Sequence, residues 1–178
     1  GDFQGLNLVF MGDAKNNVAN SLMVASAKMG INFTACGPAE CMPSDELVAI
    51  CRAIAAENNC EIRLTSDVEE GCTGANIIYT DIWVSMGEPA SLWEERIRLL
   101  SPYQVNAKVM AADNAIFLHC LPAFHDTDTS VAQDIEARFG LTEMEVTDEV
   151  FESAQSKVFD EAENRMHSIK AIVLATLG

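Results

Sequence analysis

The sequence lacks most of the features that mark membrane and nucleic-acid-binding proteins. No apolar run approaches the ~20 residues needed to cross a bilayer, although 49% of the 178 residues are hydrophobic. Only 11 lysines and arginines accompany 27 aspartates and glutamates, which gives a formal net charge of -16. Because a phosphate backbone is bound by clustered cations, this balance argues against nucleic acid and anionic membranes as partners.

The usual signs of zinc binding and export are also missing. The cysteines include no CxxC pair, and only two histidines, His119 and His125, lie near a cysteine. We therefore expect no metal site, and reduced thiols in a cytoplasmic protein. The chain begins without a methionine, a basic region or an apolar leader, which favours a fragment of a longer protein. The six cysteines are Cys36, Cys41, Cys51, Cys60, Cys72 and Cys120.

What the sequence does contain is a regular alternation of short apolar strands and amphipathic helices. The expected strands are residues 6–11, 31–35, 61–65, 76–80 and 115–120. Strands that alternate with helices indicate a parallel sheet with helices on both faces. We therefore predict an α/β protein in which residues 1–178 form a single domain. Its architecture is a three-layer α/β/α sandwich with a mostly parallel, Rossmann-like sheet of four to five strands.

Capping residues predict where the helices begin and end. Asn16 or Asn17 caps a first helix that Gly30 ends, and Ser44 caps a second helix through about residue 58. The other expected helices cover residues 67–72, 89–100 and 103–111, a stretch that starts at Asp128 or Thr129 and is closed by Gly140, and a last stretch that starts with the capping-box pattern at 160–163.

Two further expectations concern the end of the chain. Residues 144–146 are predicted to form a small edge strand. Met166, Ile169 and Val173 recur at helical spacing, and we predict that they form the buried stripe of the last helix.

The first turn lies where a dinucleotide-binding fold has its glycine-rich loop. Residues 12–17 do not read GxGxxG, and Lys15, Asn16 and Asn17 would crowd a pyrophosphate. We therefore expect no NAD and no other cofactor. An asparagine at a helix start is usually only a cap. The functional alternative is that one of the two asparagines faces the cleft and donates its amide to a carboxylate.

Asp81 ends the fourth expected strand, and Ser85, Met86 and Gly87 follow it. An acid and a hydroxyl there could accept hydrogen bonds from an ammonium group, and the turn could offer backbone N–H groups to a carboxylate. These are the requirements of an α-amino acid. The alternative is a turn in which Asp81 only binds its own backbone, and the residues favour neither interpretation.

Cys120 comes at the end of the fifth expected strand, where ligands of open parallel sheets collect. Neighbouring strand residues point to opposite faces, so His119 and Cys120 should not face the same ligand. Leu121 precedes Pro122 and is therefore kept out of the helical conformation. The alternative is a small hydrophobic cysteine in the core.

Arg165 in the last helix also has two interpretations. It could form an exposed ion pair with Glu161 four residues earlier, which would stabilise the helix only slightly. Its planar guanidinium could instead bind an oxyanion or a phosphate group.

Taken together in this order, these segments resemble the C-terminal half of ornithine carbamoyltransferase over nearly the whole chain. The matching segments are Gly12-Asp13 with Asn16-Asn17, Asp81 with Ser85-Met86-Gly87, His119-Cys120-Leu121-Pro122, and residues 158–165.

The resemblance implies transfer of the carbamoyl group of carbamoyl phosphate to the δ-amine of L-ornithine, which gives L-citrulline and phosphate. It implies a cis peptide at Leu121-Pro122 and Cys120 beside the reacting amine. Leu121, Cys120 and Arg165 would approach carbamoyl phosphate. The residues that would hold ornithine are Asn17, Asp81, Ser85 and the backbone of Met86.

The family's N-terminal half carries the Ser-Thr-Arg-Thr phosphate loop and a second phosphate site, and this sequence contains neither. The family also forms trimers with active sites between subunits. We therefore expect homotrimers of a full-length protein, and little or no catalysis by residues 1–178 alone. Two alternatives stay open: a carbamoyltransferase for another amine, such as putrescine or a modified ornithine, and a non-catalytic module that senses an amino acid.

Overall fold

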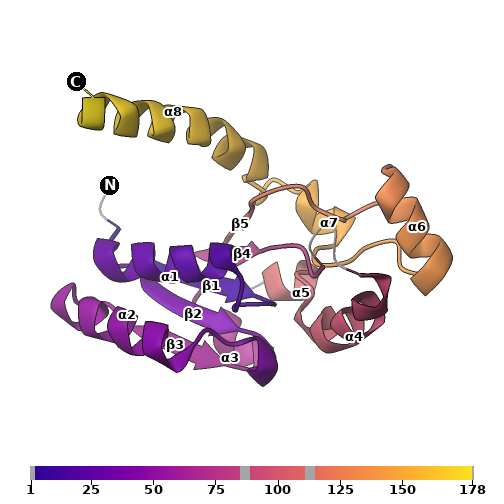
Figure 1. Cartoon of the computed structure of the whole chain (residues 1–178), viewed down its shortest axis with the longest axis horizontal. Coiled ribbons are helices and arrows are strands. Elements are labelled where there is room, and N and C mark those ends of the chain that lie inside the picture. The colour runs from indigo at the N-terminus through magenta and orange to yellow at the C-terminus, as the bar shows by residue number, and fades with distance from the viewer. Residues whose placement is uncertain (1–2, 85–88, 111–114, 178) are drawn as a thin grey trace.

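The computed structural model describes residues 3–84, 89–110 and 115–177. They form a central sheet with helices on both faces, and the last helix extends away from the body (Figure 1). This is the predicted α/β architecture. None of the described helices has the length and apolar content to cross a membrane.

The sheet has five parallel strands in the order β3-β2-β1-β4-β5. The strands are β1 (Asn7–Met11), β2 (Asn32–Cys36), β3 (Ile62–Thr65), β4 (Ile77–Thr80) and β5 (Ile116–His119). Met11 pairs with Thr80, and Thr80 pairs with His119. Because β1, β4 and β5 end in the same register, the residues that follow these three strands meet at one edge of the sheet.

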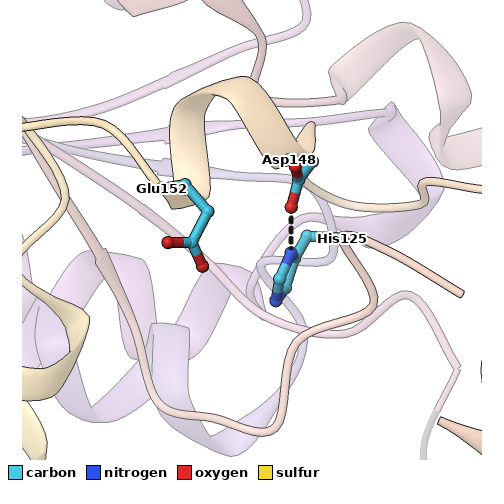
Figure 2. Close-up of side chains that lie close together, drawn as sticks. All are labelled: His125, Asp148 and Glu152. Atoms are coloured by element: carbon cyan, nitrogen blue, oxygen red, sulfur yellow. Dashed lines mark hydrogen bonds and ion pairs between the residues drawn. The ribbon is translucent and has the colours of Figure 1, made fainter. Parts of the chain in front are cut away.

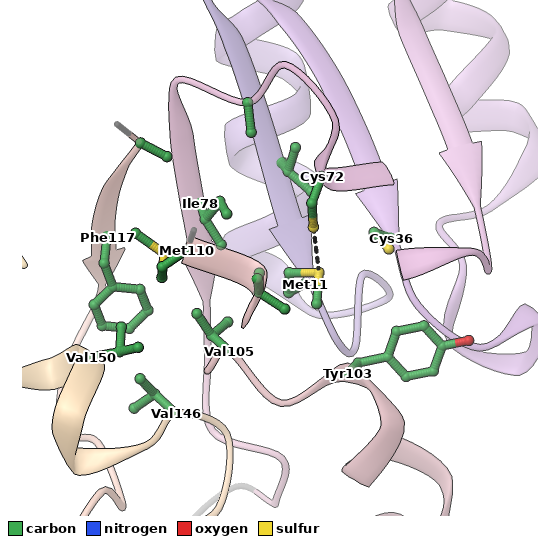
Figure 3. Close-up of a cluster of buried hydrophobic side chains, with 14 of the residues drawn as sticks. Met11, Cys36, Cys72, Ile78, Tyr103, Val105, Met110, Phe117, Val146 and Val150 are labelled. Carbon is green, nitrogen blue, oxygen red and sulfur yellow. Dashed lines mark hydrogen bonds between the residues drawn. The ribbon is translucent and has the colours of Figure 1, made fainter. Parts of the chain in front are cut away.

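Apolar side chains cover both faces of the sheet, as expected for parallel strands. On one face, α1 (Asn17–Met29) and α2 (Asp45–Glu57) pack on Phe10, Phe33 and Ile62. On the other, α3 (Val68–Cys72), α5 (Ala107–Met110) and α7 (Asp148–Phe151) enclose Met11, Ile78 and Phe117 (Figure 3). A third cluster joins α4 (Ala90–Leu100) to α6 (Ser130–Phe139).

The capping residues behave largely as predicted. Asn16, Ser44 and Thr129 each accept a backbone N–H of the helix they begin. Gly30 and Gly140 end their helices in the left-handed conformation, which glycine adopts without steric cost.

Two predicted elements are wrong in part. In place of one helix over 103–111, a 3₁₀ turn at Ser101–Tyr103 precedes the short α5. The expected strand at 144–146 makes a single parallel bridge, between Val146 and Val105. Between these two segments, hydrogen bonds from side chains and loops take the place of regular strand pairing. For example, the side-chain amide of Gln104 donates to the carbonyl of Met144.

The last helix, α8 (Val158–Leu177), begins two residues before the predicted capping box. Its predicted buried stripe is also wrong, because Met166, Ile169 and Val173 are 62%, 52% and 47% exposed. The apolar period is present in the sequence, but beyond its first turn the helix has no neighbouring layer to pack on among the described residues. Val158 is its buried residue.

Candidate functional site

The ends of β4 and β5 bring an acid and a thiol into direct contact. The Cys120 thiol donates to Oδ1 of Asp81 across 3.1 Å. The same oxygen accepts the backbone N–H of Ile82 at 2.8 Å. Asp81 therefore binds its own backbone, as one interpretation predicts, and it also contacts the neighbouring strand tip through Cys120.

Asn16 completes this arrangement from the first turn. Its side-chain oxygen caps α1 by accepting from Ala19 N at 2.8 Å, which leaves the amide free to donate to Oδ2 of Asp81 at 3.1 Å. One side chain thus begins the helix and orients the acid. The family resemblance implies a substrate-binding role for Asn17. The structure connects the neighbouring Asn16 to Asp81, and Asn17 is exposed.

A groove of about 1130 Å³ opens beside these residues, between α1 and α8. Its floor includes Tyr79 and Cys120. Asn17 lies on the α1 wall, whereas Glu161 and Arg165 lie on the α8 wall. The groove therefore joins Cys120, Asn17 and Arg165, which were predicted from separate segments of the sequence.

Cys120 is exposed, and the other five cysteines are buried or partly buried; all six are free. Partial burial, the hydrogen bond to Asp81 and the negative charge of that residue raise the pKa of the Cys120 thiol to about 12. The sulfur therefore stays protonated near neutral pH and acts as a hydrogen-bond donor to the carboxylate.

The turn after β5 has an unusual backbone. Leu121 has a positive φ of 56°, and the Leu121-Pro122 peptide is cis. The Leu121 N–H donates to Nδ1 of His119 at 2.9 Å. His119 is buried and its ring contacts Phe117, whereas Cys120 is exposed; both residues line the groove. The buried imidazole supports the turn that presents the thiol.

Comparison with known proteins identifies the family. Residues 4–176 match the family model described as the Asp/Orn binding domain of aspartate/ornithine carbamoyltransferase. The chain belongs to this carbamoyltransferase family. It is 60% identical to a catabolic ornithine carbamoyltransferase of Treponema denticola, over 99% of this chain and 53% of that protein. It is 54% identical to an ornithine carbamoyltransferase of Staphylococcus aureus, over 99% of this chain and 54% of the relative.

Solved carbamoyltransferase structures have the same fold. The ornithine carbamoyltransferase of Gloeobacter violaceus aligns with a TM-score of 0.80 at 36% identity, and covers 100% of this chain and 53% of that one. The ornithine carbamoyltransferase of Pyrococcus furiosus aligns with a TM-score of 0.81 at 35% identity, and covers 97% of this chain and 50% of that one. This carbamoyltransferase chain therefore spans about half the length of the relatives it matches.

The loop after Asp81 carries the other predicted ornithine ligands. Ser85, Met86 and Gly87 lie outside the described residues. The segment that leads to them is held by Arg96 of α4, whose Nε donates to the Trp83 carbonyl at 2.9 Å. Arg96 also forms an ion pair with Asp13 after β1. No local sequence signal points to Arg96, because only the fold brings α4 to the first turn.

Arg165 does not pair with Glu161, contrary to one of its two interpretations. Within the described part of the chain no ion pair of Arg165 is found. Glu161 instead accepts the Tyr79 hydroxyl at 2.7 Å and the His119 backbone N–H at 3.2 Å. The guanidinium of Arg165 is exposed and borders the groove, so it is available to an anion.

A second titratable cluster lies outside the groove, where His125 meets Asp148 and Glu152 (Figure 2). His125 Nδ1 is 2.8 Å from an Asp148 oxygen, and its ring stacks on Phe151 at 3.6 Å. These contacts connect the loop after β5 to α7. Both acids are exposed.

Proposed function

We propose that this chain is the ornithine-binding half of an ornithine carbamoyltransferase. The observation that carries the proposal is the hydrogen-bonded set of Asn16, Asp81 and Cys120 at the ends of adjacent strands. Relatives that are 60% and 54% identical over nearly all of this chain are named ornithine carbamoyltransferases. In the full-length protein the reaction would join carbamoyl phosphate to the δ-amine of L-ornithine and release citrulline and phosphate.

The proposed roles divide between the two ends of ornithine. Asp81 and Ser85 would accept hydrogen bonds from the α-ammonium group, and Asn17 and the Met86 backbone N–H would bind the α-carboxylate. Cys120 would lie beside the δ-amine. The Asp81 carboxylate, which contacts Cys120, favours a cationic group beside the thiol.

The δ-amine must be neutral to attack the carbamoyl carbon, and a free amine of this type has a pKa of about 10.4. The raised pKa of Cys120, about 12, makes its thiol a poor proton acceptor in this state. We therefore assign the thiol a role as hydrogen-bond donor that orients Asp81. The amine's proton would leave with the phosphate or enter solvent as the new C–N bond forms.

Carbamoyl phosphate would be held mainly by the half of the relatives' length that this chain does not cover. Arg165 and the Cys120-Leu121 turn would contribute from this side, because a planar guanidinium suits a phosphate oxyanion. The exposed apolar residues of α8 would be covered in the full-length protein. We place that protein in the cytoplasm as a homotrimer or a multiple of trimers.

Calorimetry on the 178-residue chain tests the proposal. L-ornithine and its neutral analogue norvaline should bind, whereas putrescine, which has no carboxylate, should bind much more weakly. Asp81→Asn should weaken ornithine binding at least about tenfold, because a charge-assisted hydrogen bond is lost. Asp134→Asn, on exposed α6, is the control of equal charge change. Preference for putrescine, or equal effects of the two variants, would contradict the proposal.

Turnover is a separate measurement. The isolated chain should form citrulline slowly or not at all, whereas a full-length protein that contains it should be active. Cys120→Ala in that protein removes the donor to Asp81 and should lower turnover, whereas Cys120→Ser keeps a hydroxyl donor and should lose less. Ornithine binding without any turnover of the full-length protein would instead indicate a module that only senses the amino acid.

A further inference from the structure

Glu161 connects three elements at the edge of the proposed ornithine site. It lies in the first turns of α8, and both of its carboxylate oxygens are occupied. Oε1 accepts the hydroxyl of Tyr79 from β4 at 2.7 Å, and Oε2 accepts the backbone N–H of His119 from β5 at 3.2 Å. A carboxylate that accepts two donors from different strands is held more firmly than a single contact would hold it.

Both hydrogen bonds end next to the residues of the proposed site. Tyr79 is two residues before Asp81, and His119 immediately precedes Cys120. Tyr79 is 4% exposed, and burial together with Glu161 raises the pKa of its phenol, so it remains a donor. The Glu161 carboxylate therefore binds both strands at the point where each strand reaches the cleft.

The rest of α8 depends on this attachment. Residues 162–177 are all exposed, and Val158 is the buried residue of the helix. The segment before α8 is bound to β5 through Phe117, whose carbonyl accepts from Lys157 N and whose N–H donates to Gln155. These bonds fix the start of α8, and Glu161 is the side chain that then ties its first turn to the sheet.

Arg165 follows Glu161 by four residues and therefore shares its face of the helix. Both residues line the groove that contains Cys120. A change in the direction of α8 at Glu161 would move the guanidinium relative to the thiol. Because Glu161 already accepts two hydrogen bonds and makes no ion pair among the described residues, its role is geometric.

We propose that Glu161, bound to Tyr79 and to the backbone of His119, is a positioning residue that sets Arg165 against Cys120 across the groove. This inference rests on the proposed function for the roles of Arg165 and Cys120. The attachment of α8 itself does not depend on the identity of the substrate.

Two substitutions separate geometry from charge. Glutamine has the shape of glutamate: its oxygen can accept from His119 N, and its amide can donate to the Tyr79 oxygen. Glu161→Gln should therefore keep both contacts, whereas Glu161→Ala removes both. Glu163→Ala is the matched control, since Glu163 is exposed on the same helix. Tyr79→Phe removes one of the two bonds.

The first measurement is amide hydrogen exchange of the 178-residue chain without ligand. Glu161→Ala should raise exchange in residues 162–170 and at His119 by about tenfold, the effect of losing a charge-assisted hydrogen bond. Tyr79→Phe should give a smaller increase, and Glu161→Gln and Glu163→Ala should match the parent chain. If Glu161→Ala exchanges like Glu163→Ala, or if Glu161→Gln exchanges like Glu161→Ala, the proposal is wrong.

The second measurement uses a full-length protein that contains this chain. Glu161→Ala should raise KM for carbamoyl phosphate about tenfold, with ornithine affinity within about twofold of the parent, because Arg165 moves and Asp81 does not. Glu161→Gln should restore the parent values. Equal losses for both substrates would assign Glu161 to general stability and overturn the positioning role. If no variant, including the parent, uses ornithine, the proposed function fails, while the exchange experiment still decides the attachment.

Discussion

A cysteine that is exposed and hydrogen-bonded to a carboxylate differs from a typical reactive thiol. Cationic neighbours lower the pKa of reactive thiols, whereas partial burial and, after it, Asp81 raise the pKa of Cys120 to about 12. The side chain of Cys120 is therefore exposed but unreactive as a nucleophile. The chemistry that the side chain offers is hydrogen-bond donation to Asp81.

Alkylation of Cys120 by iodoacetamide at pH 8 should accordingly be slow. A pKa near 12 in place of 9.0 reduces the thiolate fraction about a thousandfold. The greater nucleophilicity of a more basic thiolate offsets part of this, so we expect a rate about 10- to 100-fold below that of the urea-unfolded chain. Mass spectrometry of the peptide that contains Cys120 measures the alkylation rate.

Asp81→Asn should accelerate this alkylation, because the carboxylate that disfavours the thiolate is gone. Within the pH range in which the chain stays folded, the parent rate should rise throughout, and the variant rate should be higher at each pH because the pKa of its thiol is lower. Asp134→Asn provides the control for net charge. Fast alkylation of the folded parent at pH 8 would show that the thiolate is stabilised, contrary to the geometry.

At the scale of single elements, the start of α1 combines helix capping with the proposed site. The Asn16 oxygen caps the helix, and its amide binds Asp81. Serine at this position would cap equally well but has no amide to donate. The two roles of Asn16 can therefore be separated by substitution.

We expect Asn16→Ala to lower the free energy of unfolding by about 1 kcal/mol, the usual value of an N-cap. Thr129→Ala, at the cap of α6, should cost about the same and leave ornithine binding unchanged. Urea denaturation measures the free energy of unfolding, and calorimetry measures ornithine binding.

Asn16→Ser separates the two roles of Asn16, because serine keeps the helix cap and loses the amide that binds Asp81. It should keep stability within about 0.5 kcal/mol of the parent and still weaken ornithine binding severalfold, because Asp81 loses its orienting donor. Full retention of ornithine affinity in Asn16→Ser would mean that Ile82 N and Cys120 suffice to hold the carboxylate.

At the scale of the whole molecule, α8 leaves an apolar surface without a partner in the described residues. Met166 and Leu174 are 62% and 64% exposed, and neither lines the groove. We expect the isolated chain to self-associate through this helix as its concentration rises.

The double substitution Met166→Gln with Leu174→Gln should shift the chain toward the monomer in sedimentation velocity. Its melting temperature should change little, because both side chains are already largely exposed. Ile50→Gln on α2, where the side chain is 50% exposed, is the control and should not alter association. A parent chain that is monomeric at every concentration would refute the expectation.

The local signals of this sequence determined the elements and much of the candidate site. Apolar runs located all five strands, and Ser44 and Thr129 marked helix starts correctly, because capping and alternation depend on neighbours in sequence. The motifs around Asp81 and Cys120 were recognised for the same reason. Only the tertiary structure connected Asn16 to Asp81, Arg96 to Trp83 and Glu161 to Tyr79, since these partners are 65, 13 and 82 residues apart. It also decided that the apolar stripe of α8 is exposed: periodicity predicts which residues share a face, whereas burial requires a second surface in contact with that face.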